Sequence, residues 1–232
     1  MEQADTRVAT SAPGAQPIRG RTAIRRVIAA YDQPIIRAYS WGRFQIFRQR
    51  FLDEIGQYLP EEGRVLDIGC GFGLFGLYFA QVHPRVQLSG FDLSESRVAI
   101  ANDAARKLGI ANARFEVGDA TELRARQRFD VVYMLDVVHH VAPATVRRLI
   151  EEVHASLPSG GRLLVKELDT EPAWQRVFAH VLDLAMSPSQ PPHYWAAAEL
   201  SGLLREVGFD VKRHAMVDIL PYPHVLYVAT KR

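Results

Sequence analysis

The chain is poor in cysteine, in lysine and in long apolar runs. Its single cysteine, Cys70, excludes a disulfide within the 232 residues and fits a reducing compartment such as the cytoplasm. No apolar run approaches the ~20 residues that cross a membrane, and the N-terminus lacks the apolar region of a signal peptide. The sequence therefore predicts neither a disulfide-stapled secreted scaffold nor a membrane-inserted protein, and it favours a cytoplasmic location.

Charge is nearly balanced but unevenly distributed. The formal net charge of +2 favours no nucleic-acid partner, and the 24 arginines against four lysines fit a bias in genomic base composition. Residues 1–50 hold nine arginines and three acids. This excess is typical of a solvated helix face, and a basic patch that touches an anionic substrate or a membrane surface is the alternative.

The most informative segment is a strand that ends in a glycine-rich turn. Residues 65–68 are largely apolar, Gly69, Gly71 and Gly73 follow, and residues 74–80 form an apolar segment typical of a helix. Glycine lets a backbone turn sharply and approach a ligand closely, and the start of a helix offers free N–H groups. This combination predicts a cradle for a nucleotide on an α/β sheet.

The identity of that nucleotide depends on one acid. Residues 71–76 fit the dinucleotide pattern G-x-G-x-x-G, but Asp67 would oppose a pyrophosphate, and the chain shows no second mononucleotide-binding half. With Asp67 included, the pattern D-x-G-x-G-x-G resembles motif I of the class I S-adenosylmethionine (SAM) dependent methyltransferases. SAM carries a sulfonium, an ammonium and a ribose in place of phosphates.

Further motifs follow in the order of that family. Asp92 ends a second strand about 20 residues past the turn, the offset of a carboxylate that binds ribose hydroxyls. Asp119 follows a third strand, residues 129–136 form a fourth, and residues 157–165 resemble the family's L-x-P-G-G signature and fifth strand. The resemblance covers roughly residues 60 to 230.

The family implies a specific fold. We expect an α/β protein with a seven-stranded Rossmann-like methyltransferase sheet, mostly parallel, with an antiparallel strand from a C-terminal β-hairpin and helices on both faces. Ser94 is the expected N-cap of the helix that ends near Leu108, and Gly109 and Gly208 are expected to end helices. The expected parts are a disordered tail (1–18), an N-terminal helical cap (19–59), and a SAM-binding domain (60–232) with a helical lid near 171–192.

The N-terminal cap is expected to hold two helices, residues 21–31 and 43–58, joined by residues 32–41. In class I methyltransferases such helices often cover the cofactor. Tyr31 and Tyr39 are therefore candidates for contacts with the covered site, and ordinary aromatic packing is the alternative for each.

The resemblance assigns the acids at the strand ends to the cofactor. Asp67 would hold the methionine ammonium directly or through water, Asp92 the ribose, and Asp119 with Ala120 the adenine edge. Ligands of open α/β sheets bind at this end of the strands. The implied cofactor contacts are Asp67, Gly69, Gly71, Phe72, Asp92, Leu93, Asp119, Ala120 and Leu135.

Candidate catalytic groups follow the fourth and fifth strands. His139 and His140 have the acid–base range of a general base, and Glu167 also lies toward the expected substrate side. Histidines at this place also serve backbone and packing needs, and that alternative stays open. We predict no metal site, since adjacent histidines point apart and the chain has no H-x-x-x-H motif or cysteine cluster.

The leading hypothesis is methyl transfer from SAM, which becomes S-adenosylhomocysteine, to an oxygen or nitrogen of a small molecule, with carbon as a further option. The apolar lid residues Trp174 and Phe178 favour an apolar or aromatic acceptor. An RNA or protein methyltransferase is the first alternative, although residues 134–137 lack the N-P-P-Y motif of amino-directed enzymes. A non-catalytic SAM-binding protein is the second. Nucleic-acid binding is not favoured, and a homodimer formed by the first helices is open.

Overall fold

The computed structural model describes residues 16–119, 128–169, 193–216 and 223–232. Its helices are α1 (Gly20–Ala30), α2 (Pro34–Ile46), α3 (Gln49–Gly56), α4 (Leu74–Val82), α5 (Glu95–Leu108), the 3₁₀ turn η2 (Val138–His140), α6 (Pro143–Ser156) and α8 (Ala197–Val207). Its strands are β1 (Glu62–Ile68), β2 (Arg85–Asp92), β3 (Ala113–Val117), β4 (Val131–Leu135), β5 (Arg162–Leu168), β6 (Phe209–Ala215) and β7 (His224–Lys231).

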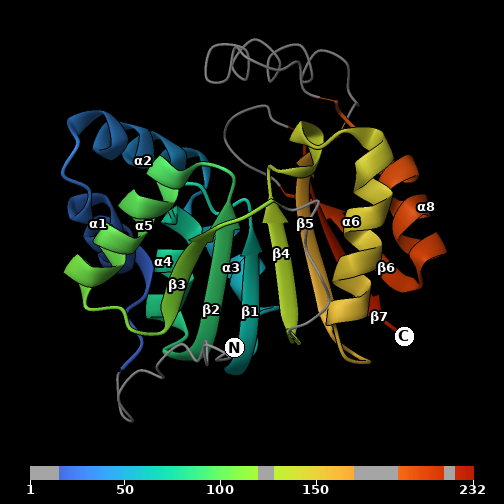
Figure 1. The fold of residues 1–232 in the computed structure, drawn as a ribbon, viewed down its shortest axis with the longest axis horizontal. Coiled ribbons are helices and arrows are strands. Elements are labelled where there is room, and N and C mark those ends of the chain that lie inside the picture. Colours follow the sequence, from blue (N-terminus) through green and yellow to red (C-terminus); the bar gives the residue numbers. More distant parts are fainter. Residues whose placement is uncertain (1–15, 120–127, 170–192, 217–222) are drawn as a thin grey trace, which may run out of the picture.

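The seven strands form one sheet in the order β3-β2-β1-β4-β5-β7-β6 (Figure 1). The first five strands in this order pair in parallel, and β7 inserts antiparallel between β5 and β6. The expected mostly parallel sheet with an antiparallel C-terminal strand is therefore confirmed. Because parallel strands share a direction, the ends of β1, β2, β4 and β5 meet at one edge, where ligands of such sheets bind.

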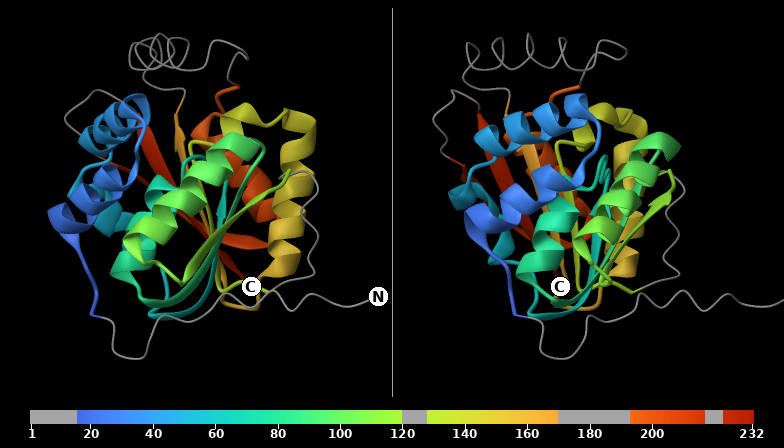
Figure 2. Two further views of the ribbon diagram at one scale, coloured as in Figure 1. Left: turned by 60° about the vertical axis from the view of Figure 1, so that its left-hand side comes forward. Right: turned by 90° about the vertical axis from the view of Figure 1, so that its left-hand side faces the viewer.

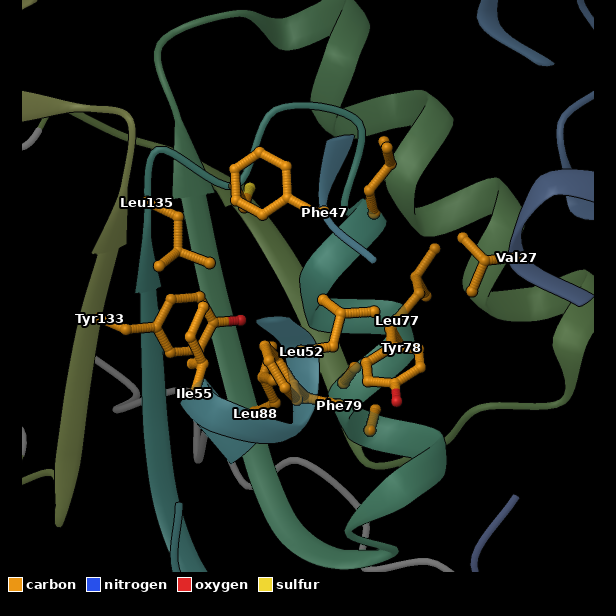
Figure 3. Packing of buried hydrophobic residues seen from close by; sticks show 14 of the residues in the cluster. Val27, Phe47, Leu52, Ile55, Leu77, Tyr78, Phe79, Leu88, Tyr133 and Leu135 are labelled. Carbon is orange, nitrogen blue, oxygen red and sulfur yellow. The ribbon is translucent and has the colours of Figure 1, made fainter. Parts of the chain in front are cut away.

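Helices cover both faces of the sheet, as expected. Helices α1 to α5 pack on one face, and α6 and α8 pack on the other. Strand β4 is buried along its whole length, as a strand covered on both faces should be. Figure 3 shows the first layer, where Leu77 and Phe79 of α4 lie near Leu52 and Ile55 of α3 and Tyr133 of β4.

The N-terminal segment corrects one expectation. Residues 34–46 form a helix, whereas the sequence predicted a connection over 32–41 and one helix over 43–58. Pro34 begins α2, because its fixed φ suits the first turn of a helix. The backbone leaves the helix at Phe47 (φ −88°, ψ 75°), whose fully buried ring packs on Phe51 and Phe75 with ring centroids 4.6 and 4.7 Å away. The single helix that the sequence predicted over residues 43–58 is thus interrupted at the point where this ring is buried.

Helix ends follow local chemistry as predicted. The Ser94 hydroxyl accepts a hydrogen bond from the Arg97 N–H (3.4 Å) at the start of α5. Gly109 and Gly208 end α5 and α8 in the left-handed region, with φ of 69° and 116°.

Parts of the expected organisation lie outside the described residues. These are residues 1–15 of the tail, the expected lid with Trp174 and Phe178, and Ala120. Ile18 is described, and its N–H donates to the Gln81 carbonyl at 3.0 Å. Among the described residues, no helix combines the length and the apolar character that crossing a membrane requires.

Candidate active site

The turn between β1 and α4 has the shape that the glycines predicted. Gly69, Gly71 and Gly73 have φ of 76°, 53° and 77°, a region that L side chains rarely adopt. A Cβ on Gly69 would lie 2.6 Å from a methyl of Val137, so this side chain, just after β4, closes this side of the turn. A Cβ on Gly71 would meet no described atom within 4 Å. The turn is therefore open at Gly71, where a ligand can approach the backbone.

Asp92 braces this turn from the end of β2. Its carboxylate accepts hydrogen bonds from the N–H of Gly71 (3.0 Å) and the N–H of Ser94 (2.9 Å). Each carboxylate oxygen can accept a second bond, so these contacts leave acceptor capacity for a ligand's hydroxyls. The acid predicted for the ribose thus lies directly beside the open glycine.

Asp67 is a buried carboxylate at the end of β1. Burial raises its pKa to about 7; the Tyr133 hydroxyl opposes this rise, and the Asp92 carboxylate adds to it. The Tyr133 hydroxyl is itself buried and makes no hydrogen bond of ordinary geometry among the described residues. A carboxylate in this setting gains from a cationic partner such as an ammonium group.

The N-terminal helices cover the glycine turn. The Tyr31 hydroxyl donates to the Phe72 carbonyl at 2.9 Å, and the Tyr39 ring meets the Phe72 ring edge-on with centroids 5.7 Å apart. Figure 2 shows α2 at the end of the sheet where the parallel strands end. Both tyrosines therefore contact the turn, which is one of the two roles that the sequence left open for them.

Two apolar side chains stand exposed beside the turn. Leu93 after β2 is 72% exposed and Val117 at the end of β3 is 55% exposed. Asp119 follows two residues later and is partly buried. Leu135 is buried at the end of β4. The predicted cofactor residues that are described thus gather around the ends of β1 to β4.

Glu167 and His139 form a buried pair on the other side of β4. Glu167 Oε1 accepts from the N–H groups of Val137 (3.0 Å) and Val138 (2.6 Å), and Oε2 lies 2.6 Å from His139 Nδ1. Three contacts thus hold the carboxylate and orient the His139 ring. The Tyr194 ring stacks on His139 at 6.0 Å between centroids, while His140 is exposed.

A second buried charge cluster surrounds Asp136, at the end of β4. Asp136 has φ 59°, the one described non-glycine residue in the left-handed region. Its carboxylate pairs with Arg43 of α2 (2.9 Å) and with the fully buried Lys166 of β5. Burial opposes ionisation of Asp136, but the charges of Lys166 and Arg43 outweigh it and lower its pKa. This cluster ties the N-terminal cap to the sheet.

The sequence analysis did not single out Arg43 or Lys166. Lys166 carried a signal, because it is one of four lysines and interrupts the apolar run of β5. Its ammonium lies 4.8 Å from the centroid of the Phe47 ring. Arg43 carried no such signal, since its partner lies 93 residues away.

Asp169, the acid that directly follows β5, accepts a hydrogen bond from the Ala197 N–H at 3.2 Å near the start of α8. Within the described ranges, no three histidine, cysteine or acidic side chains gather as metal ligands would.

The fold and site define an α/β protein with a glycine turn shaped for a nucleoside. Residues 41–214 match the family described as methyltransferase domain, and the chain belongs to this family. It is 37% identical over 106 residues to ubiquinone biosynthesis O-methyltransferase of Agrobacterium fabrum, a match that covers 43% of this chain and 41% of that protein. It is 32% identical over 109 residues to demethylspheroidene O-methyltransferase of Rhodobacter capsulatus, covering 47% and 26%.

Solved structures agree on the fold. YcgJ from Bacillus subtilis matches with a TM-score of 0.64 at 20% identity, over 80% of this chain and 100% of that chain. The chain spans less than half the length of the two curated relatives it matches. S-adenosylmethionine is the cofactor of the family, and the residues present fit it: Gly71 opens toward free space, and Asp67 and Asp92 flank it.

Asp67→Asn is expected to stabilise the cofactor-free protein at alkaline pH. Because folding raises this pKa from 3.8 to about 7, the native state loses stability as pH rises between these values, and the cost is complete above pH 7. The variant avoids this cost, so its free energy of unfolding at about pH 8 should exceed that of the wild type by up to about 4 kcal/mol, and the gain should shrink toward pH 4.

Urea unfolding of both proteins at several pH values measures this gain. Asp210→Asn, at an exposed acid of β6, is the matched control and should change little. A gain that does not depend on pH would contradict the buried-carboxylate explanation.

Proposed function

We propose that this chain transfers a methyl group from SAM to a hydroxyl oxygen of a small apolar or aromatic molecule, with nitrogen or carbon as other acceptor atoms. Membership of the methyltransferase domain family supports the reaction. Both relatives named above are O-methyltransferases, which supports oxygen as the acceptor. The Tyr194 ring stacked on His139 supports an aromatic or apolar acceptor.

The observation that carries this proposal is the Glu167–His139 pair beside the glycine turn. Val137 contacts both the turn and the pair. Its side chain occupies the space next to Gly69, and its N–H donates a hydrogen bond to Glu167. The proposed methyl donor and general base thus lie on neighbouring strand ends, which is the arrangement that a transfer between two bound molecules requires.

The proposed roles follow from these contacts. When bound, SAM supplies a methyl group already activated by its sulfonium. His139 would accept the proton that the acceptor hydroxyl loses when its oxygen takes up this methyl group. Glu167 positions the ring through Nδ1 and stabilises the imidazolium that results. Asp67 and Asp92 hold the cofactor's ammonium and ribose.

The proposal is tested with labelled SAM and a panel of hydroxylated aromatic acceptors, with RNA and protein fractions as further acceptors. Label in a small hydroxylated product supports it. Label confined to RNA or protein would show that the chain is an RNA or protein methyltransferase instead. Cofactor binding without any transfer of label would show that it is a non-catalytic SAM-binding protein. We also propose a cytoplasmic site of action, supported by the single buried thiol of Cys70.

Asp92→Ala is expected to weaken binding of S-adenosylhomocysteine by about 1–3 kcal/mol, because ribose hydroxyls and the Gly71 N–H lose their acceptor. Calorimetry with S-adenosylhomocysteine measures the loss. Asp103→Ala, at an exposed acid of α5 that pairs with Arg106, is the control and should bind as the wild type does. Equal affinity of the Asp92 variant would remove this residue from the cofactor site.

A further inference from the structure

Helix α2 carries apolar side chains on both of its faces. Its inner face buries Ile36 and Phe44 against the domain. Its outer face exposes Ile35 (82%), Trp41 (59%) and Tyr39 (38%). These are three of the five large apolar side chains that are exposed in the described part of the chain, and the other two flank the cofactor turn. The fold therefore leaves the outer face of α2 without a packing partner among described residues.

The helices that carry this apolar face are rich in positive charge. From residue 16 to the end of α2 the only acid is Asp32, and its carboxylate pairs with Lys107 of α5 at 2.5 Å. Exposed arginines in α1, in α2 and at the start of α3 are Arg21, Arg25, Arg26, Arg37 and Arg48. An exposed apolar face with a cationic border, rich in tryptophan and tyrosine, is typical of helices that lie in the interface of an anionic membrane.

The position of this face links it to the active site. Tyr39 lies on the outer face and also contacts Phe72 of the glycine turn, while Arg43 of the same helix reaches Asp136. Figures 1 and 2 show α2 at the end of the sheet where the parallel strands end. A surface that receives α2 would therefore lie next to the entrance of the candidate site.

We propose that Ile35, Tyr39 and Trp41 form a membrane-docking surface, bordered by the exposed arginines, that binds the headgroup region of an anionic phospholipid bilayer. Apolar side chains enter the boundary between headgroups and acyl chains, and the arginines face the lipid phosphates. A second copy of the chain fits less well, because a twofold contact would bring two cationic borders together. The proposal concerns peripheral binding and does not depend on the acceptor of the methyl group.

Vesicle cosedimentation of the whole protein tests the proposal. We expect binding to phosphatidylcholine vesicles with about 30% phosphatidylglycerol to exceed binding to pure phosphatidylcholine at least tenfold, and to weaken as salt rises from about 0.1 to 0.5 M. Ile35→Ser with Trp41→Ser should lower binding to the anionic vesicles about tenfold or more. Val207→Ser, at a half-buried apolar residue of α8 on the opposite face of the sheet, is the control and should bind like the wild type.

Arg37→Glu with Arg48→Glu keeps the apolar residues and should also weaken anionic binding about tenfold, because each arginine near the surface adds attraction. Circular dichroism and S-adenosylhomocysteine affinity check that each variant is folded. Equal vesicle binding by the folded double variants, or no preference of the wild type for anionic vesicles, would overturn the proposal. Sedimentation that shows a dimer lost in the Ile35–Trp41 variant, without vesicle binding by the wild type, would assign the surface to a second copy.

Discussion

Replacing His139 with glutamine is expected to lower kcat for methyl transfer to a hydroxyl about 10²–10⁴-fold, the usual contribution of a positioned general base. Glutamine keeps a polar side chain near Glu167 but cannot take the proton that the acceptor loses. Affinity for S-adenosylhomocysteine should stay near that of the wild type, because His139 lies across Val137 from the glycine turn. Steady-state kinetics and calorimetry on the same preparations measure the two quantities.

His140→Gln is the matched control, since this neighbouring histidine is exposed. We expect it to retain most activity. A phenol that is already ionised at the assay pH should recover much of the activity of the His139 variant, because no proton then needs to be removed. An equal loss of activity with this ionised phenol and with a neutral one would show that His139 serves structure rather than proton transfer.

Lys166→Met is expected to lower the free energy of unfolding by about 3 kcal/mol or more, since it leaves a buried carboxylate with one cation in place of two. Methionine fills a similar volume, so the loss reports the charge and not a cavity. Burial favours the neutral form of Lys166, and the Asp136 carboxylate opposes this effect. Urea unfolding at neutral pH measures the change.

Two comparisons sharpen this prediction. Lys107→Met removes an exposed lysine from its pairs with Asp32 and Asp103 and should change stability little, because exposed ion pairs contribute little. Adding Asp136→Asn to Lys166→Met should restore part of the loss, since the carboxylate that lost one of its two cations is then replaced by a neutral amide. Similar losses in the two lysine variants would show that the Asp136 cluster does not stabilise the fold through its charges.

Local chemistry made much of the fold predictable from the sequence. The mostly parallel seven-stranded sheet and the caps at Ser94, Gly109 and Gly208 were expected and are confirmed, because each depends on neighbours within a few residues or on a repeated strand–helix pattern. The first N-terminal helix was expected over residues 21–31 and agrees with α1, whereas the second was placed wrongly. Pro34 was taken as part of a connection, and the burial of Phe47 among aromatic rings of α3 and α4 depends on elements that local pattern does not show.

The candidate site was likewise predictable from the sequence only in part. Gly69, Gly71 and Asp92 were predictable, since a turn that needs positive φ and an acid about 20 residues later are local signals. The position of Glu167 was predicted, but its pairing with His139 across β4 and β5 was not. The Arg43–Asp136–Lys166 cluster was missed, because Arg43 and Asp136 are 93 positions apart and no periodicity joins them.

The sequence by itself determined the family, the sheet and the glycine turn after β1, because each depends on backbone conformation and on the order of elements along the chain. Only the tertiary structure decided the pKa values of the buried acids. The pKa of Asp67 rises to about 7 and that of Asp136 falls, although both are aspartates at the ends of neighbouring strands. Burial acts on both, and the cations that α2 and β5 bring to Asp136 alone make the difference.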